Sequence, residues 1–230
     1  MYNSSTLTTK EIINNYKNVC ERAKIAAESV GREYDSICII VVTKTFNTEV
    51  FIPLIDLGHK NFGENKVQEA ENKWKPLLNN YCNLKLHLIG HLQSNKIKKA
   101  MELFHTIHTI DSHKRLNGII KNINNQNIVC EEFFIEVNMA NEEQKSGIKQ
   151  DELSELIHHI NKNNLSGCNG LMCIPPYDEE PSPYFLLLQK IATKIQIKNL
   201  SMGMSNDFEK AIQFGATHIR VGSEIFGPRL

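Results

Sequence analysis

The sequence predicts a single α/β domain over residues 1–230, folded as a compact (β/α)8 barrel of the TIM type with an additional helix before the first strand. Short apolar runs rich in β-branched residues, typical of buried parallel strands, alternate with amphipathic helical segments. Eight such runs can be counted, and strict alternation of strands and helices indicates a parallel sheet. The alternative is an open, doubly wound sheet. The chain lacks a GxGxxG motif after its first strand, which disfavours the dinucleotide-binding form of that alternative.

The amino-terminal segment is predicted to be the additional helix. Thr8 and Glu11 form a capping box, apolar residues between Ile12 and Ala27 form one face, and Gly31 ends the helix. A helix in this position could cover one end of the barrel. The other predicted helices span residues 48–57, 67–78, 93–103, 114–123, 151–161, 184–197 and 207–214.

The predicted strands direct attention to a lysine. In a TIM barrel, the carboxyl ends of the strands carry the functional residues, and the first apolar run leads directly to Lys44. Partial desolvation there would lower the pKa of the amine and make it a nucleophile toward aldehydes. The alternative is that Lys44 marks only where the strand meets water. The predicted strands span residues 37–42, 59–62, 85–89, 105–110, 132–138, 170–174, 200–203 and 217–221.

The turns after the last two predicted strands favour a phosphate site. The segment 201–205 leads into a helix that Ser205 would cap, and the segment 222–227 could begin a short helical turn. Backbone N–H groups at helix starts, serine hydroxyls and a glycine that permits close approach together form a phosphate cradle. Barrels frequently bind phosphate after strands 7 and 8. The alternative is that both segments are ordinary caps and turns.

Arg220 adds a third feature to this site. It lies two residues before Gly222, so the strand period of two directs both toward the same side. A lysine able to form an imine, a phosphate cradle and an inward-facing arginine together indicate a phosphorylated aldehyde. Pyridoxal 5′-phosphate (PLP) fits this description.

Composition and charge exclude several other classes of protein. The 26 basic and 26 acidic residues balance, so there is no basic excess for binding nucleic acid. No apolar stretch is long enough for a membrane span, and the amino terminus lacks a signal-peptide pattern. Six cysteines without a CxxC pair are typical of a reduced, cytoplasmic protein. His87 and His91 resemble a metal-binding pair but straddle Gly90, so no metal site is expected. The balanced charge and the absence of an unpaired apolar stripe predict a monomer.

Several motifs also carry a resemblance to a known family. The chain resembles the pyridoxal phosphate homeostasis proteins, which bind PLP on a barrel similar to the amino-terminal domain of alanine racemase (the type III PLP fold without the carboxyl-terminal β domain). The matching segments are 42–44, 62–69, 87–96, 136–138, 145–147, 170–175, 200–205 and 220–227.

This resemblance implies a role for each site residue. Lys44 would hold PLP as an imine, Asn65 would lie near the cofactor, and Arg220 would face the pyridine nitrogen. A permanently charged arginine disfavours protonation of that nitrogen and makes the ring a weaker electron sink. Phosphate contacts would come from Ser201, Ser205, Gly222 and Ser223.

The resemblance favours a protein of intracellular PLP homeostasis without established catalysis, which would hold PLP and pass it to PLP-dependent apoenzymes. A racemase needs a second base, supplied in alanine racemase by a tyrosine of the carboxyl-terminal domain. This sequence shows no such domain before Leu230, and Tyr177 is the nearest candidate. A small PLP-dependent amino-acid racemase remains the alternative, and a Schiff-base aldolase or other sugar-phosphate barrel enzyme is a third. Lys145 either reaches the mouth of the site or belongs to a solvated loop.

Overall fold

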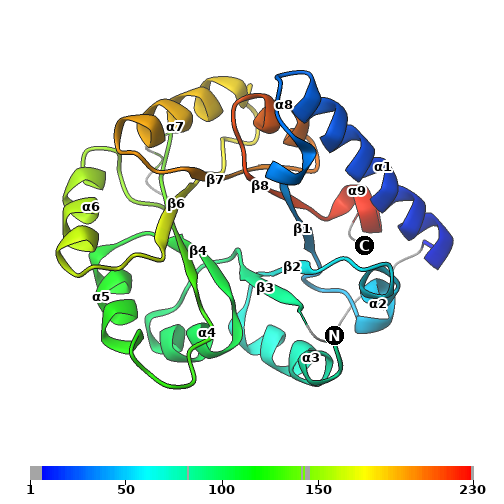
Figure 1. Cartoon of the computed structure of the whole chain (residues 1–230), viewed down its shortest axis with the longest axis horizontal. Coiled ribbons are helices and arrows are strands. Elements are labelled where there is room, and N and C mark those ends of the chain that lie inside the picture. Colours follow the sequence, from blue (N-terminus) through cyan, green and yellow to red (C-terminus); the bar gives the residue numbers. More distant parts are fainter. Residues whose placement is uncertain (1–6, 82, 141, 143–145, 229–230) are drawn as a thin grey trace.

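The protein forms a closed barrel of eight parallel strands with helices around it (Figure 1). The structure is a computed structural model that describes residues 7–81, 83–140, 142 and 146–228. Consecutive strands pair along the chain, and β8 pairs with β1 to close the ring. The predicted single-domain (β/α)8 barrel is therefore confirmed. The strands are β1 (Cys38–Val42), β2 (Asn61–Glu64), β3 (Lys85–Leu88), β4 (Thr106–Ile110), β5 (Glu132–Glu136), β6 (Cys168–Met172), β7 (Asn199–Met204) and β8 (His218–Val221).

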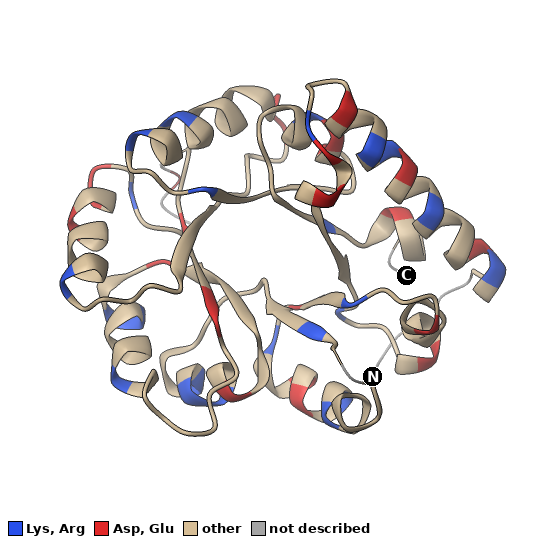
Figure 2. Ribbon diagram, viewed as in Figure 1, with Lys and Arg blue, Asp and Glu red and all other residues tan. Residues whose placement is uncertain are grey.

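The helices lie outside the strands and bury their apolar faces against them. Lysines, arginines, aspartates and glutamates are interspersed on these outer helices, as Figure 2 shows. Within the described residues, no helix is both long and apolar enough to cross a membrane. The helices are α1 (Thr9–Glu28), α2 (Thr48–Asp56), α3 (Val67–Asn80), α4 (Ile97–Leu103), α5 (His113–Asn122), α6 (Leu153–Lys162), α7 (Ser182–Lys194), α8 (Phe208–Gln213) and α9 (Ser223–Phe226).

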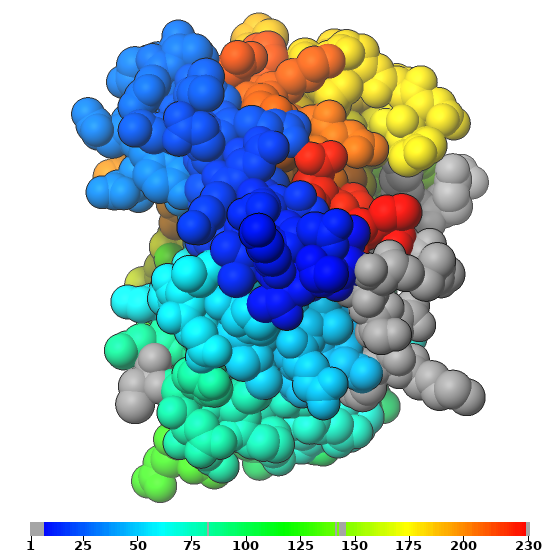
Figure 3. Space-filling model, turned by 90° about the vertical axis from the view of Figure 1, so that its right-hand side faces the viewer, coloured from blue at the N-terminus to red at the C-terminus, as the bar shows by residue number. Residues whose placement is uncertain are grey.

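The additional helix α1 lies along the flank of the barrel and does not cover an end, so that expectation was wrong. It packs against α2, α8 and α9 (Figure 1), and Figure 3 shows it in blue between the cyan segments and the orange and red carboxyl-terminal segments. Helix α9, which follows β8, is only four residues long. It is too short to cover the outer face of β8 and β1. The buried Val19, Ala23 and Ala27 of α1 cover it.

Strand β2 lies two residues later in the chain than predicted, and the shift matters for the site. It ends at Glu64, which is fully buried, although glutamate rarely occupies such a position. His59, expected to begin the strand, lies before it and contacts the Tyr16 hydroxyl through Nδ1 at 2.9 Å. The burial of Glu64 depends on partners from other elements, which local periodicity does not report.

The barrel interior is unexpectedly polar. The rings of His87, His108, Phe134 and His218 pack against one another, and His108 stacks on Phe134 with 4.4 Å between centroids. Gly170 leaves room for this layer, because a Cβ there would lie 2.2 Å from the Phe134 ring. The main apolar core fills the space between the strands and the outer helices.

Candidate functional site: a cavity at the carboxyl ends of the strands

A cavity of about 780 Å³ opens where β1, β2, β6, β7 and β8 end. This volume suits a small-molecule ligand, and the position is where TIM barrels bind substrates and cofactors. Six of the seven site residues predicted from the sequence line it. They are Lys44, Asn65, Ser205, Arg220, Gly222 and Ser223.

Lys44 enters the cavity from the turn that follows β1. Val42 and Phe46, two residues on either side, line the same cavity, whereas the intervening Thr43 is fully buried. Asn65 follows β2 in the same way. Its backbone lies so close to Gly90 that a Cβ at that glycine would be 2.3 Å from the Asn65 carbonyl oxygen. The turns after β1 and β2 thus bring the Lys44 amine and the Asn65 amide to the same cavity.

The turns after β7 and β8 meet at Ser205. Its Oγ accepts hydrogen bonds from the backbone N–H groups of Gly222, at 3.3 Å, and Glu224, at 3.4 Å. Gly222 packs closely on β1, because a Cβ there would lie 3.3 Å from both Cβ and the carbonyl oxygen of Val42. A hydroxyl, a glycine and helix-start N–H groups therefore gather at one side of the cavity. This is the donor set that a phosphate group requires.

Asp207 is a cavity residue that the sequence analysis missed. Its Oδ1 accepts the Met204 backbone N–H at 2.6 Å, which ties the turn after β7 together. Burial raises the pKa of the Asp207 carboxyl above its ordinary value. Aspartate in a turn is common, so the sequence carried no signal for a place in the cavity.

Ser201 does not line the cavity, so the structure places it away from the expected phosphate contact. It is fully buried inside the barrel, within β7 and not at its carboxyl end. Its Oγ accepts a 2.7 Å hydrogen bond from Arg220 Nη1, while Arg220 Nη2 donates to the Cys173 carbonyl at 3.0 Å. Ser201 therefore orients Arg220 from below. Strand register decides this, because Ser201 pairs with His218, one layer beneath Arg220.

A chain of hydrogen bonds continues from Ser201 through the barrel. Ser201 Oγ lies 2.9 Å from His108 Nδ1, and His108 Nε2 lies 3.0 Å from His87 Nδ1. His87 Nε2 lies 3.2 Å from Asn61 Oδ1. The Asn61 side-chain carbonyl oxygen can only accept, so a neutral His87 donates from Nε2 and accepts at Nδ1 from His108 Nε2, which leaves His108 Nδ1 to accept the Ser201 hydroxyl proton. This direction requires both histidines to carry their proton on Nε2.

The two histidines of this chain are uncharged in the fold. Burial lowers the pKa of His87 and of His108 well below the ordinary value, and the neighbouring His218 and, for His108, Arg220 lower it further. The sequence analysis treated His87 and His91 as a possible pair, but the fold separates them. His91 lies outside, with Nε2 at 2.7 Å from Arg115 Nη2.

Glu136, the last residue of β5, is a second ionisable group that the sequence analysis missed. Burial raises its pKa to about 7, and the negative charge of Asp111 acts in the same direction. The charges of Arg220 and Arg115 oppose this rise. Glu136 therefore titrates near neutral pH within the electrostatic reach of Arg220.

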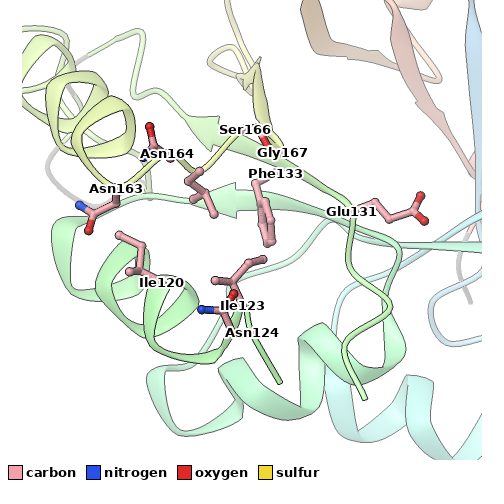
Figure 4. Close-up of a pocket in the computed structure, with 10 residues that line it drawn as sticks. Ile120, Ile123, Asn124, Glu131, Phe133, Asn163, Asn164, Ser166 and Gly167 are labelled. Atoms are coloured by element: carbon pink, nitrogen blue, oxygen red, sulfur yellow. The ribbon is translucent and has the colours of Figure 1, made fainter. Parts of the chain in front are cut away.

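A second hollow of about 340 Å³ lies at the other end of the barrel (Figure 4). Glu131 and Gly167, which line it, immediately precede β5 and β6, and Asn163 and Asn164 come from the turn after α6. TIM barrels place their chemistry at the carboxyl ends of the strands, so we assign the functional site to the cavity around Lys44.

Fold and cavity define this protein as a ligand-binding (β/α)8 barrel with a lysine in the turn after its first strand and a buried arginine on its last strand. Residues 35–229 match the family of the alanine racemase N-terminal domain. The pyridoxal phosphate homeostasis protein of Aquifex aeolicus is 38% identical over 220 residues, covering 92% of this chain and 95% of the relative. That of Escherichia coli K12 is 34% identical over 231 residues, covering 95% and 97%.

A solved structure supports the same assignment. PipY of Synechococcus elongatus, solved with PLP bound, is similar with a TM-score of 0.78 and 29% identity, covering 91% of this chain and all of that one. On the basis of these matches, the chain belongs to the pyridoxal phosphate homeostasis protein family, within the alanine racemase N-terminal domain family.

Proposed function

We propose that the protein binds PLP in the cavity around Lys44 and serves intracellular PLP homeostasis. The observation that carries this proposal is the convergence in one cavity of the Lys44 amine, the Arg220 guanidinium and the donor groups around Ser205 and Gly222. The names of the curated relatives and the PLP-bound structure of PipY support it. Bound PLP would supply an aldehyde that condenses with a lysine amine and releases water.

Each residue of the cavity has a part in this proposal. Lys44 presents the amine, and Asn65 lies beside it at the end of the neighbouring strand. Arg220, held by Ser201 and the Cys173 carbonyl, would face the ring nitrogen of bound PLP, and its positive charge would disfavour protonation of that nitrogen. The phosphate contacts would come from the backbone N–H groups and hydroxyls of Ser205, Gly222 and Ser223.

We propose that this binding occurs without catalysis. A protonated ring nitrogen makes PLP a stronger electron sink, and Arg220 would oppose that protonation, which would restrain carbanion chemistry. A racemase also needs a positioned second base, whereas the Tyr177 side chain at the cavity is 90% exposed to solvent. The small-racemase alternative predicts a measurable rate. PLP-dependent apoenzymes as recipients, a monomeric state and a cytoplasmic location, all expected from the sequence, belong to the same proposal.

Borohydride reduction of the PLP-loaded protein, followed by peptide mass spectrometry, tests the proposal. We expect a phosphopyridoxyl group on Lys44 and its disappearance in Lys44→Ala. An unmodified Lys44 in the folded, PLP-supplemented protein would overturn the assignment and favour a sugar-phosphate ligand.

A racemisation assay separates the two PLP-based functions. L-alanine and L-glutamate would be incubated with the loaded protein in D2O, and chiral chromatography and solvent deuterium uptake at Cα would be followed. We expect no turnover above free PLP. Racemisation that is abolished by Lys44→Ala and reduced by Tyr177→Phe would establish the enzyme alternative instead.

A further inference from the structure

The turn that presents Lys44 is strained. Thr45, the next residue, has a φ of +71°, in the left-handed region that β-branched residues rarely adopt. Its Oγ1 is also buried without a hydrogen-bond partner in the described structure. Such a conformation persists only where the surrounding structure imposes it, and it is found preferentially at functional sites.

Helix α3 supplies the contacts that impose it. Glu69 Oε1 accepts the Thr45 backbone N–H at 2.9 Å. One helical turn further on, Lys73 Nζ donates to the carbonyl oxygens of Thr43, at 2.9 Å, and Phe46, at 3.1 Å. These contacts hold the backbone immediately before and after the pair Lys44–Thr45.

Glu64 at the end of β2 completes the arrangement. Its Oε1 lies 2.8 Å from Lys73 Nζ and accepts hydrogen bonds from Thr43 Oγ1, at 2.7 Å, and Trp74 Nε1, at 3.0 Å. The side chains of Lys73 and Glu64 are 1% and 0% exposed. The rings of Phe51 and Trp74 stack beside them, with 4.9 Å between centroids.

A buried ion pair is a poor means of stabilising a fold, because desolvation of both charges offsets their attraction. What such a pair does provide is fixed geometry, because three donors converge on Glu64 Oε1, although Oε2 is buried without a hydrogen-bond partner in the described structure. Lys73 directs its ammonium to the Glu64 carboxylate and to two backbone carbonyls of the Lys44 turn, and the Glu69 carboxylate lies 3.7 Å away. This arrangement suits a device for holding that turn.

We propose that Glu69 and Lys73, supported by Glu64, are positioning residues that hold the strained turn at Thr45 and thereby direct the Lys44 amine into the cavity. Only the identity of the ligand that Lys44 binds depends on the proposed function. The conformational part, that these side chains hold residues 43–46, stands on the hydrogen bonds alone.

The first experiment compares matched variants on one helix. Lys73→Met and Glu69→Ala remove the contacts to the turn, while Glu69→Gln retains an acceptor for the Thr45 N–H. Lys75→Met and Glu71→Ala serve as controls. Those two side chains form an ion pair with each other, with 2.8 Å between Lys75 Nζ and Glu71 Oε1, and this pair lies away from the turn. Two readouts are taken: amide hydrogen exchange of residues 44–46 without PLP, and the rate of imine absorbance after PLP is added.

We expect imine formation to slow by about tenfold or more in Lys73→Met and Glu69→Ala, since small misplacements of a reacting group are costly. Amide hydrogen exchange at the turn should accelerate in the same two variants. Imine formation in Glu69→Gln should keep a rate near that of the wild type, and in both controls it should remain within about twofold of the wild-type rate. Unchanged exchange and unchanged rates in folded Lys73→Met and Glu69→Ala would overturn the proposal. If Lys73→Met fails to fold, the Glu69 series decides.

A double-mutant cycle with Thr45→Gly tests the strain directly. Glycine adopts a φ of +71° without steric penalty and removes the buried hydroxyl. Glu69→Ala should therefore slow imine formation less in the Thr45→Gly background than in the wild type, and equal effects in both backgrounds would argue against a held strain. A wild type that forms no imine at Lys44 would instead refute the proposed function, and hydrogen exchange would still test the turn.

Discussion

Lys44 illustrates how much of a site residue's role comes from its neighbours. Replacing it with alanine would remove the amine of the proposed imine but leave Arg220, Ser205 and Gly222 at the cavity. We therefore expect Lys44→Ala to fold and to bind PLP without a covalent bond, with affinity reduced by at least about tenfold, or ~1.4 kcal/mol. Equilibrium dialysis of PLP, with circular dichroism as the folding control, measures this. Unchanged affinity or complete loss of folding would contradict the expectation.

Arg220 and the histidines beneath it form a second unit at the scale of single residues. If Asn61 Oδ1 sets the direction of the chain, His108 and His87 are both protonated on Nε2 and stay neutral at pH 6. Long-range ¹H–¹⁵N spectra of histidine-labelled apoprotein distinguish the two tautomers. In Ser201→Ala the Arg220 donor loses its acceptor, at a cost of ~1–3 kcal/mol, and the His108 shifts should change. A wild-type His108 protonated on Nδ1 would reverse the proposed direction.

At the scale of elements, helix α1 takes the place on the barrel wall that the short α9 leaves open. Its contact with α8 and α9 depends on small residues, and Ala23 is fully buried there. Ala23→Leu should overpack this contact and destabilise the protein by ~2 kcal/mol. Lys24→Leu, at the adjacent exposed position, should change stability by less than ~0.5 kcal/mol. Thermal unfolding measures both, and equal Tm values for the two variants would mean that α1 is not closely packed on the barrel.

For the whole molecule, the buried histidines make stability depend on pH. Burial lowers the pKa of His87 and His108, and that of His218 to about 4. Below the ordinary histidine pKa near 6.5, the unfolded chain therefore binds protons that the folded chain does not, and stability falls as pH falls. Burial also lowers the pKa of His59 to about 4, so these buried histidines together should make the folded protein less stable at pH 5.5 than at pH 7.5.

Glu136 changes the pH dependence of stability in the opposite direction to the histidines. Its folded pKa of about 7 lies above the ordinary carboxyl value, so the folded protein gains stability as pH falls through 7, by ~2 kcal/mol at pH 5.5. The several buried histidines outweigh the one glutamate, so urea denaturation of the apoprotein should show a net loss of stability between pH 7.5 and 5.5. Glu136→Gln removes the compensation, so the variant should lose ~2 kcal/mol more than the wild type over this range. A variant that loses less than the wild type would contradict the assigned titration.

The sequence by itself determined the architecture and the main site positions. The alternation of apolar runs with amphipathic segments is a local property, and eight repeats of it specify a parallel barrel. Once the barrel is specified, closure brings the carboxyl ends of the strands together. Lys44, Asn65 and Gly222, far apart in the chain, therefore had to meet at one end.

The tertiary structure decided which polar groups face one another. Ser201 and Arg220 looked like residues of one cavity, but strand register placed Ser201 a layer deeper, beneath the arginine. Glu64 and Lys73 were not singled out in the sequence, yet they form a buried ion pair that contacts the backbone and side chain of Thr43 in the Lys44 turn. Periodicity reports which face of an element is apolar. It does not report the partner of a buried polar group, which depends on register and packing between elements distant in sequence.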